Sequence, residues 1–169
     1  DPFTQGEGLS RATIRRAVEK SLQRLQTDYI DVYYAHVEDP SVEIAETLEA
    51  FAELKKEGKI RASGASNHSI WRVERAKQIS RQHGWPEYCC IQDAHSYIKP
   101  MASRRRRFAT NDTLDYCASN PDTTLVAYTP TIWGKLAKPD EWDGAEYWGE
   151  FYSRDIDARL DALRQVATN

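Results

Sequence analysis

Residues 31–40, DVYYAHVEDP, end an apolar run of β-branched and aromatic residues on His36, with two acids and a proline close behind. A run of this kind is typical of a largely buried β-strand. A histidine inside such a strand is most often a core residue whose hydrogen bonds are satisfied. Its position at the strand's end leaves a second interpretation open, in which His36 belongs to a functional site.

Length and charge narrow the classes of protein to consider. The 169 residues fit one domain of ordinary size. The net charge of −3 argues against a nucleic-acid partner or an anionic membrane surface, because both require a clustered positive excess. We interpret the basic block Arg104–Arg107 as a solvated loop or first helical turn rather than a phosphate-binding patch. No apolar run reaches the ~18 residues of a membrane helix, and no secretory signal pattern opens the chain.

The cysteines indicate a reducing compartment. There are three, and Cys89 and Cys90 are adjacent within a strand-like segment, so a disulfide framework is not expected. We therefore expect a cytoplasmic protein. No cysteine lies at zinc-ligand spacing from a histidine, and no metal site is predicted.

Strand and helix patterns alternate along the chain. Ser10 is predicted to cap a helix whose apolar face is Ile14, Val18, Leu22 and Leu25, and Ser41 to cap a second with Ile44, Leu48 and Phe51, ended by Gly58. Further helices are predicted around 71–79, ended near Gly84, around 112–118, and from Ser153 or Arg154 onward with Ile156, Leu160 and Leu163 on one face. The predicted strands are residues 29–36, 59–66, 88–94 and 123–130, and residues 131–152 are predicted to form a loop.

The spacing of the strands predicts the fold class. Their ends fall near His36, Ser66, Gln92 and Tyr128, which are 30, 26 and 36 residues apart, the length of a βα unit. Such an alternation implies a parallel sheet covered by helices, either a (β/α)8 barrel or a doubly wound sheet. No G-x-G-x-x-G opens a helix, which counts against the dinucleotide-binding doubly wound form. In both architectures function gathers beyond the carboxyl ends of the strands, where these four residues lie.

Two long motifs resemble the aldo-keto reductase family. SLQRLQTDYIDVYYAHVED (residues 21–39) is similar to the family's S-L-x-R-L-x-T-D-Y-I-D-x-Y-x-x-H, and EGKIRASGASN (residues 57–67) is similar to its G-K-[IV]-R-x-x-G-x-S-N. Looser matches follow in IQDAHSYI and LVAYTPTIWGKL. The resemblance implies an α/β fold, a (β/α)8 TIM barrel with about the middle four βα units in this chain. It also implies an NADP (or NAD) cofactor, a small-molecule carbonyl substrate and no metal.

The resemblance also implies roles for individual residues. His36 is the expected catalytic histidine, which hydrogen-bonds the substrate carbonyl oxygen and polarises it. Ser66, Asn67 and Gln92 are expected to hold the nicotinamide carboxamide, a group matched chemically by a hydroxyl and two side-chain amides. Tyr128 is expected to stack on the nicotinamide, and Thr129 to lie by the pyrophosphate with the backbone near Thr131 and Gly134.

Each of these interpretations has a structural alternative. Asn67 could cap the following helix. Gln92 could satisfy a neighbouring strand end, and Tyr128 could be ordinary packing at the rim of the barrel. Departures from the family pattern, namely Thr129-Pro130-Thr131 for Ser-Pro-Leu and His95 for the usual Tyr, suggest a divergent branch.

The resemblance places the family's catalytic Asp, Tyr and Lys before Phe3, so they have no counterpart here. We expect residues 1–8 to be a leader or vector-derived segment and residues 9–169 to be the central part of one barrel domain. The isolated chain is then expected to be inactive. Its open sheet edges predict self-association or a complementary barrel half as partner. The alternative function is a non-catalytic relative that binds cofactor or a regulatory partner.

Overall fold

The computed structural model describes residues 7–100, 108–138, 146 and 148–168. The predictions for residues 1–6 and for Arg104–Arg107 lie outside these ranges. The chain divides into two compact units, Asp1–Asp93 with Ala109–Val126 and Ala94–Phe108 with Ala127–Asn169. Each unit is described by itself.

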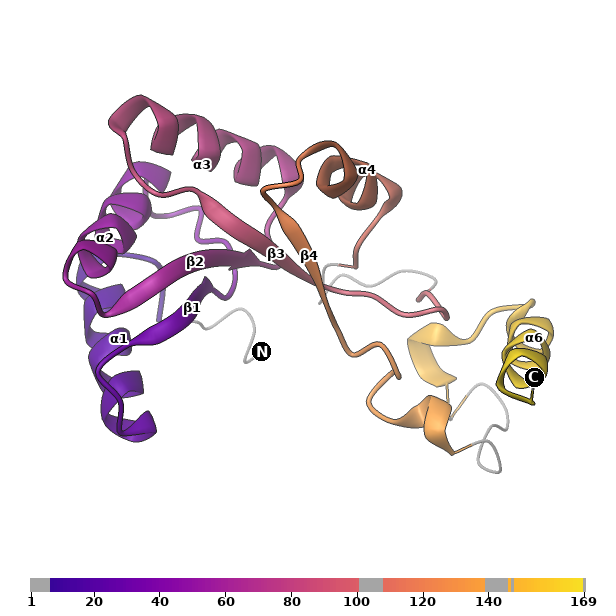
Figure 1. The fold of residues 1–169 in the computed structure, drawn as a ribbon. Coiled ribbons are helices and arrows are strands. Elements are labelled where there is room, and N and C mark those ends of the chain that lie inside the picture. Colours follow the sequence, from indigo (N-terminus) through magenta and orange to yellow (C-terminus); the bar gives the residue numbers. More distant parts are fainter. Residues whose placement is uncertain (1–6, 101–107, 139–145, 147, 169) are drawn as a thin grey trace. The chain divides into compact units, whose positions relative to one another are not determined.

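Parallel strands form the frame of the fold (Figure 1). The sheet has the order β1 (Ile30–Ala35), β2 (Ile60–Ser66), β3 (Tyr88–Ala94), β4 (Thr124–Tyr128), and both β1–β2 and β2–β3 pair in parallel. Helices α1 (Arg11–Leu25), α2 (Ile44–Lys56), α3 (Ile70–His83) and α4 (Asn111–Ser119) alternate with the strands. The predicted class, a partial (β/α) barrel with strands adjacent in chain order, is confirmed.

Local signals explain most helix ends, with two corrections. Ser10 caps α1 as predicted, since its side chain accepts from the Thr13 amide, but Leu25 is 63% exposed and does not belong to the buried face. Ser41 does not cap α2, whose N-cap is Glu43. The Asp39 side chain captures Ser41 instead, because its Oδ1 accepts from both the amide, at 3.0 Å, and the hydroxyl, at 2.6 Å, of that serine.

The core of the first unit lies between the sheet and α1–α3. Val18, Leu48 and Val73 from the three helices share one buried cluster with strand residues Ala35, Ala65 and Ile91. Phe51 at its centre is 2% exposed and makes edge contacts with Tyr33 of β1 and Tyr88 of β3, with ring centroids 6.3 and 6.1 Å apart. These contacts identify the helix-covered face of the sheet.

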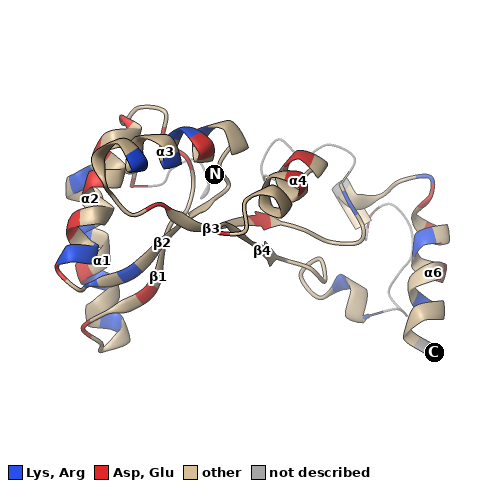
Figure 2. Cartoon of the chain, turned by 45° about the horizontal axis from the view of Figure 1, so that its top comes forward, with Lys and Arg blue, Asp and Glu red and all other residues tan. Residues whose placement is uncertain are grey.

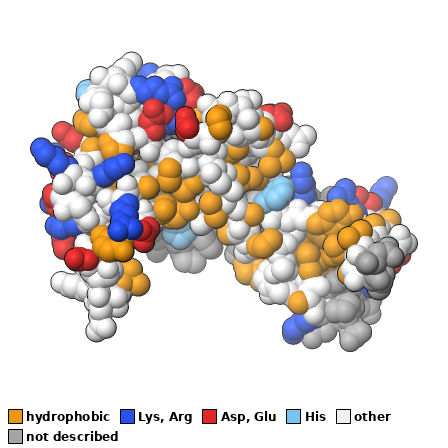
Figure 3. All heavy atoms as spheres, in the orientation of Figure 1, with side chains coloured by type: hydrophobic (Ala, Val, Ile, Leu, Met, Phe, Trp, Pro, Cys, Tyr) orange, Lys and Arg blue, Asp and Glu red, His pale blue; other side chains and the backbone are white. Residues whose placement is uncertain are grey.

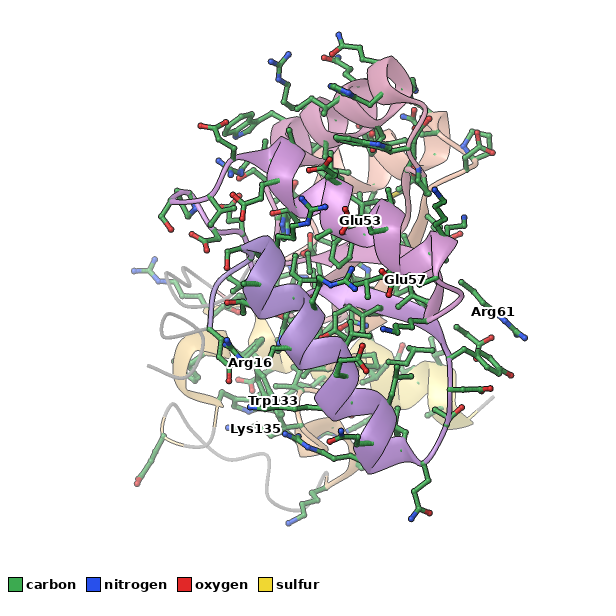
Figure 4. All side chains as sticks on the ribbon, turned by 90° about the vertical axis from the view of Figure 1, so that its left-hand side faces the viewer. Arg16, Glu53, Glu57, Arg61, Trp133 and Lys135 are labelled. Carbon is green, nitrogen blue, oxygen red and sulfur yellow. The ribbon has the colours of Figure 1, made fainter. Side chains whose placement is uncertain are left out.

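Ion pairs join the outer surfaces of α1 and α2 (Figures 2 and 4). Arg11 and Arg15 of α1 both pair with Glu53 of α2, and Arg15 also reaches Glu57 at 2.8 Å. These side chains are about a third or more exposed. Each pair therefore contributes only about 0.2–1 kcal/mol to stability.

The other face of the first unit's sheet carries Tyr34, Gly64 and Cys90. Val32 on this side is 37% exposed, and the space-filling view shows hydrophobic side chains at the surface of this unit (Figure 3). A Cβ on Gly64 would lie 2.6 Å from the Cys90 sulfur and 2.7 Å from the Tyr34 ring. Glycine is therefore required here for close packing.

We expect Gly64→Ala to lower the free energy of unfolding by about 1–3 kcal/mol, because the added methyl overpacks the site. Urea denaturation followed by circular dichroism measures the change. A matched Gly58→Ala control meets no atom within 4 Å, although its positive φ adds backbone strain. Unchanged stability of the Gly64 variant would contradict the packing assignment.

The second unit has its own small core. Trp148, Phe151, Ile156 and Leu160 are buried together with Ile98 and Ile132. The described part of the predicted loop over residues 131–152 includes the short 3-10 turns η1 (Lys135–Ala137) and η3 (Gly149–Phe151). The last helix, α6, spans Ile156–Thr168, so it begins two to three residues later than predicted. Among the described residues no helix has the length and apolar character to cross a membrane.

Candidate functional site

The ends of β1, β2 and β3 bring four predicted site residues together. The strand registers place Ala35 beside Ala65 and Ser66 beside Gln92, so His36, Ser66 and Gln92 emerge at one edge. Asn67 bridges the three ends, since its Nδ2 donates to the His36 carbonyl oxygen at 3.0 Å and its amide to the Gln92 carbonyl oxygen at 3.2 Å. Of the four strand-end residues expected at one edge, His36, Ser66 and Gln92 lie together within the first unit, with Asn67 between them. Tyr128 belongs to the second unit, and its place at this edge stays a prediction.

His36 lies beyond the last residue of β1, and its side chain is exposed. The alternative in which it is a core histidine is therefore wrong for this structure. The reason is that the apolar run ends at Ala35, which is fully buried, and the next residue already leaves the sheet. An imidazole in this position is accessible to a small molecule at the strand ends.

Asn67 holds a backbone conformation that few residues adopt. Its φ is +56°, in the left-handed region that asparagine tolerates better than most residues. The alternative role as helix cap is wrong, because Ser69 occupies the N-cap position of α3. Asn67 Nδ2 also lies 3.0 Å from the Ser66 hydroxyl oxygen, which accepts from it. The residue thus turns the chain at the strand end and orients its neighbour.

A small network tethers the segment after His36 to the start of α3. Glu38 accepts from the amide of Ser69 at 3.4 Å and pairs with Arg72 at 3.3 Å, and the side chains of Glu38 and Arg72 are only 23% and 17% exposed. We did not predict these residues from the sequence. The available signal was an acid just after one strand, together with a serine and an arginine opening the helix after the next strand.

His68 supports the same edge from the buried side. It is 6% exposed, its Nδ1 lies 2.8 Å from the Ser66 carbonyl oxygen, and its ring makes an edge contact with Tyr88. Because a carbonyl oxygen can only accept, Nδ1 carries the hydrogen. His68 therefore fixes the backbone of Ser66, while the Ser66 side chain, 1% exposed, is held by Asn67.

Gln92 shares the open face of the sheet with Tyr34. Burial raises the pKa of the Tyr34 phenol to about 12, and the Cys90 thiol beside it acts in the same direction, whereas a hydrogen bond with Gln92 opposes them. Tyr34 is therefore a neutral phenol near pH 7, able to donate or accept. The Gln92 side chain therefore lies beside Tyr34 on this face.

Tyr128 and Thr129 belong to the second unit. The Tyr128 carbonyl oxygen accepts from the His95 amide at 3.2 Å, and the Thr129 carbonyl oxygen accepts from the Ile132 amide at 2.9 Å. Thr129 has a φ of +53°, which is rare for a β-branched residue. Strain of this kind is found preferentially at functional sites. The assignments of Tyr128 and Thr129 remain predictions.

A small pocket with room for about one water molecule lies on the helix-covered side of the first unit. Tyr88, whose pKa is raised by burial, and Arg72 line it, but His36, Asn67 and Gln92 do not. His68, which supports the strand-end edge through the Ser66 carbonyl oxygen, also lines this pocket, so the pocket adjoins that edge from the helix-covered side. Nowhere in the described ranges do three or more histidine, cysteine or carboxylate side chains gather as a metal site would require.

The fold and the strand-end residues define a partial (β/α) barrel with polar side chains gathered at the carboxyl edge of its strands. The sequence profile of the Aldo/keto reductase family matches residues 2–147. The chain belongs to this family.

Individual relatives agree with that assignment. The chain is 35% identical over 131 residues to an aldo-keto reductase of Fusarium vanettenii, covering 78% of this chain and 33% of that protein. It is 39% identical over 117 residues to aldo-keto reductase YhdN of Bacillus subtilis, covering 69% and 31%. A crystal structure of a thermostable aldo-keto reductase with the inhibitor epalrestat matches with a TM-score of 0.67 and 27% identity, covering 95% of this chain and 48% of that one. The chain thus spans about a third of the length of these two curated relatives.

Proposed function

We propose that the protein containing this chain is an NAD(P)H-dependent oxidoreductase that reduces small aldehydes or ketones. The observation that carries the proposal is the bridge by Asn67, which gathers His36, Ser66 and Gln92 at the carboxyl edge of three parallel strands. Family membership supports the reaction class. A cytoplasmic location, and either self-association or a complementary barrel half as partner, are parts of the same proposal.

His36 is the proposed electrophilic group. Its exposed imidazole would donate a hydrogen bond to the carbonyl oxygen and stabilise the negative charge that develops there during hydride transfer. The proton that completes the alcohol would come from a tyrosine outside residues 1–169. Glu38, Ser69 and Arg72 would keep the His36 segment in place, because they bind that segment to α3.

The donors and acceptors at the edge fit a nicotinamide carboxamide. That group offers one acceptor and two donors, and Ser66, Asn67 and Gln92 together supply a hydroxyl and two amides. Bound there, the cofactor would supply the hydride. Tyr128 would stack on its ring and Thr129 would lie by its pyrophosphate. NADP is proposed first, with NAD as the alternative.

The second candidate is a non-catalytic relative that binds the cofactor or a partner in a regulatory role. It is kept because the tyrosine and lysine that the family resemblance requires for turnover are expected outside this chain. A Tyr and a Lys at the two preceding strand ends of the natural gene would favour the enzyme, and their absence would favour the binding protein.

We expect the full-length protein to oxidise NADPH in the presence of a test aldehyde, and the 169-residue chain to give no turnover above background. The reason is that the proposed proton donor is a tyrosine outside residues 1–169, whereas His36 is proposed only to polarise the carbonyl. Absorbance at the NADPH band measures both rates after host reductases have been removed. Cofactor binding without turnover in the full-length protein would instead support the regulatory alternative, and turnover by the isolated chain would contradict the assignment of the missing proton donor.

A further inference from the structure

Cys89 and Cys90 form a pair of neighbouring thiols that the proposed reduction does not use. Their sulfur atoms lie 3.7 Å apart, although successive side chains of a regular strand point to opposite faces. The strand register explains this proximity. Ser63 pairs with Tyr88 and Ala65 with Ile91, so two steps along β2 match three along β3, and the additional residue makes a bulge at the two cysteines.

The surroundings keep this dithiol in place. The Cys90 sulfur lies 3.2 Å from the Tyr34 hydroxyl. It occupies space that a side chain at position 64 would otherwise fill, since a Cβ on Gly64 would lie 2.6 Å from this sulfur. Cys90 is 5% exposed, whereas Cys89 is partly exposed and is therefore the thiol that a reagent from solvent can reach first. Burial raises the pKa of Cys90 to about 11, so this sulfur is a neutral thiol near pH 7 rather than a nucleophilic thiolate.

A direct disulfide does not suit this pair. The Cα atoms of adjacent residues are about 3.8 Å apart, below the ~4.4 Å at which ordinary disulfides begin. A single atom bonded to both sulfurs is a better match, because two sulfurs that each lie about 2.3 Å from a shared atom are about 3.8 Å apart at a tetrahedral angle and somewhat closer at the narrower angles of a pyramidal centre. A closed zinc site would need four ligands, and the described residues near this pair supply no histidine or carboxylate for a third.

We propose that Cys89 and Cys90 form a binding site for thiophilic reagents that bridge two sulfurs through one atom, of which monosubstituted trivalent arsenicals are the chemical class. The condensation balances without redox change. In R–As(OH)2 both As–OH bonds break and both thiol S–H bonds break, two As–S bonds form, and the hydroxyls leave with the thiol protons as two molecules of water. Arsenic keeps its +3 state throughout.

The test uses the 169-residue chain and phenylarsine oxide. We expect native mass spectrometry to show one arsenical per chain for the unmodified protein and for the control Cys117→Ala, whose thiol is on α4. Cys89→Ala and Cys90→Ala are each expected to abolish binding. Cys89 is the less buried of the two, so its variant keeps the test informative if Cys90→Ala does not fold. Binding that persists in folded Cys89→Ala, or no binding by the unmodified chain, would overturn the proposal.

A second measurement separates a built site from the mere adjacency of two cysteines. The arsenical is removed by titration with 2,3-dimercaptopropanol, for the native chain and for the chain in urea. Because the bulge holds the sulfurs in place before binding, the native chain should need at least about tenfold more competing dithiol for half removal, the gain expected from preorganisation. Equal competitor concentrations in the two states would show that the fold contributes nothing and would overturn the proposal.

Discussion

His36→Ala in the full-length protein is expected to lower kcat/KM for an aldehyde by roughly 10²–10³, which corresponds to about 3–4 kcal/mol of transition-state stabilisation. The effect is large because a hydrogen bond to the developing oxyanion is stronger in the transition state than to the neutral carbonyl. The position of His36, exposed and directly after β1, gives it access to such an oxygen. Steady-state kinetics with saturating NADPH measures the change.

Two controls make this result specific to His36. Cofactor affinity should remain nearly unchanged, because carboxamide binding is proposed for Ser66, Asn67 and Gln92. The second control is His83→Ala, which removes another exposed histidine, one that stacks on Trp85 at the end of α3. This variant should leave kcat/KM within a factor of about two, because it is a surface substitution away from the site. A His36 variant with unmodified turnover, or one that has lost its native circular dichroism, would remove the catalytic assignment.

Phe51→Ala is expected to lower the free energy of unfolding by about 3–5 kcal/mol, the usual cost of a large cavity in a core. Phe51 is 2% exposed and its ring meets Tyr33 and Tyr88 from the two outer strands of the β1–β3 group. Loss of this ring would therefore remove its contacts with Tyr33 of β1 and Tyr88 of β3. Urea denaturation measures the shift of the transition midpoint.

The matched control for this packing prediction is Leu25→Ala. Leu25 is 63% exposed at the end of α1, so its truncation should change the free energy of unfolding by no more than about 0.5 kcal/mol. Equal effects of the two substitutions would show that Phe51 does not hold the core together. Retention of native stability by Phe51→Ala would do the same.

Several features could be predicted from the sequence because they depend on local chemistry or on periodicity. Ser10 is both a strong capping residue and the last residue before the apolar period of α1. Gly84 ends α3 in a left-handed conformation that glycine adopts without strain. The approximately thirty-residue repeat of strands determined the parallel sheet, since only a helical crossover of that length returns the chain in the same direction.

Other features depend on partners distant in the chain, and the sequence pattern did not reveal them. Ser41 has the right residue type for a helix cap, yet its amide and hydroxyl donate hydrogen bonds to the Asp39 side chain instead. Glu38 and Arg72 are 34 residues apart and meet only because β1 and β2 are neighbours in the sheet. A residue's type limits what it can bind, but its partner is decided by which strands and helices pack together.

For the candidate site, the sequence by itself determined which residues end the strands and what chemistry they carry, because strand length and polar residue types are local properties. Tertiary structure decided the rest. Parallel pairing set His36, Asn67 and Gln92 at one edge, and Asn67 adopts its left-handed backbone to bridge them. The bulge in β3 brought Cys89 and Cys90 onto one side, which alternation along a strand would not predict. The physical reason is that register and bulges follow from pairing with another strand, and no single segment contains that information.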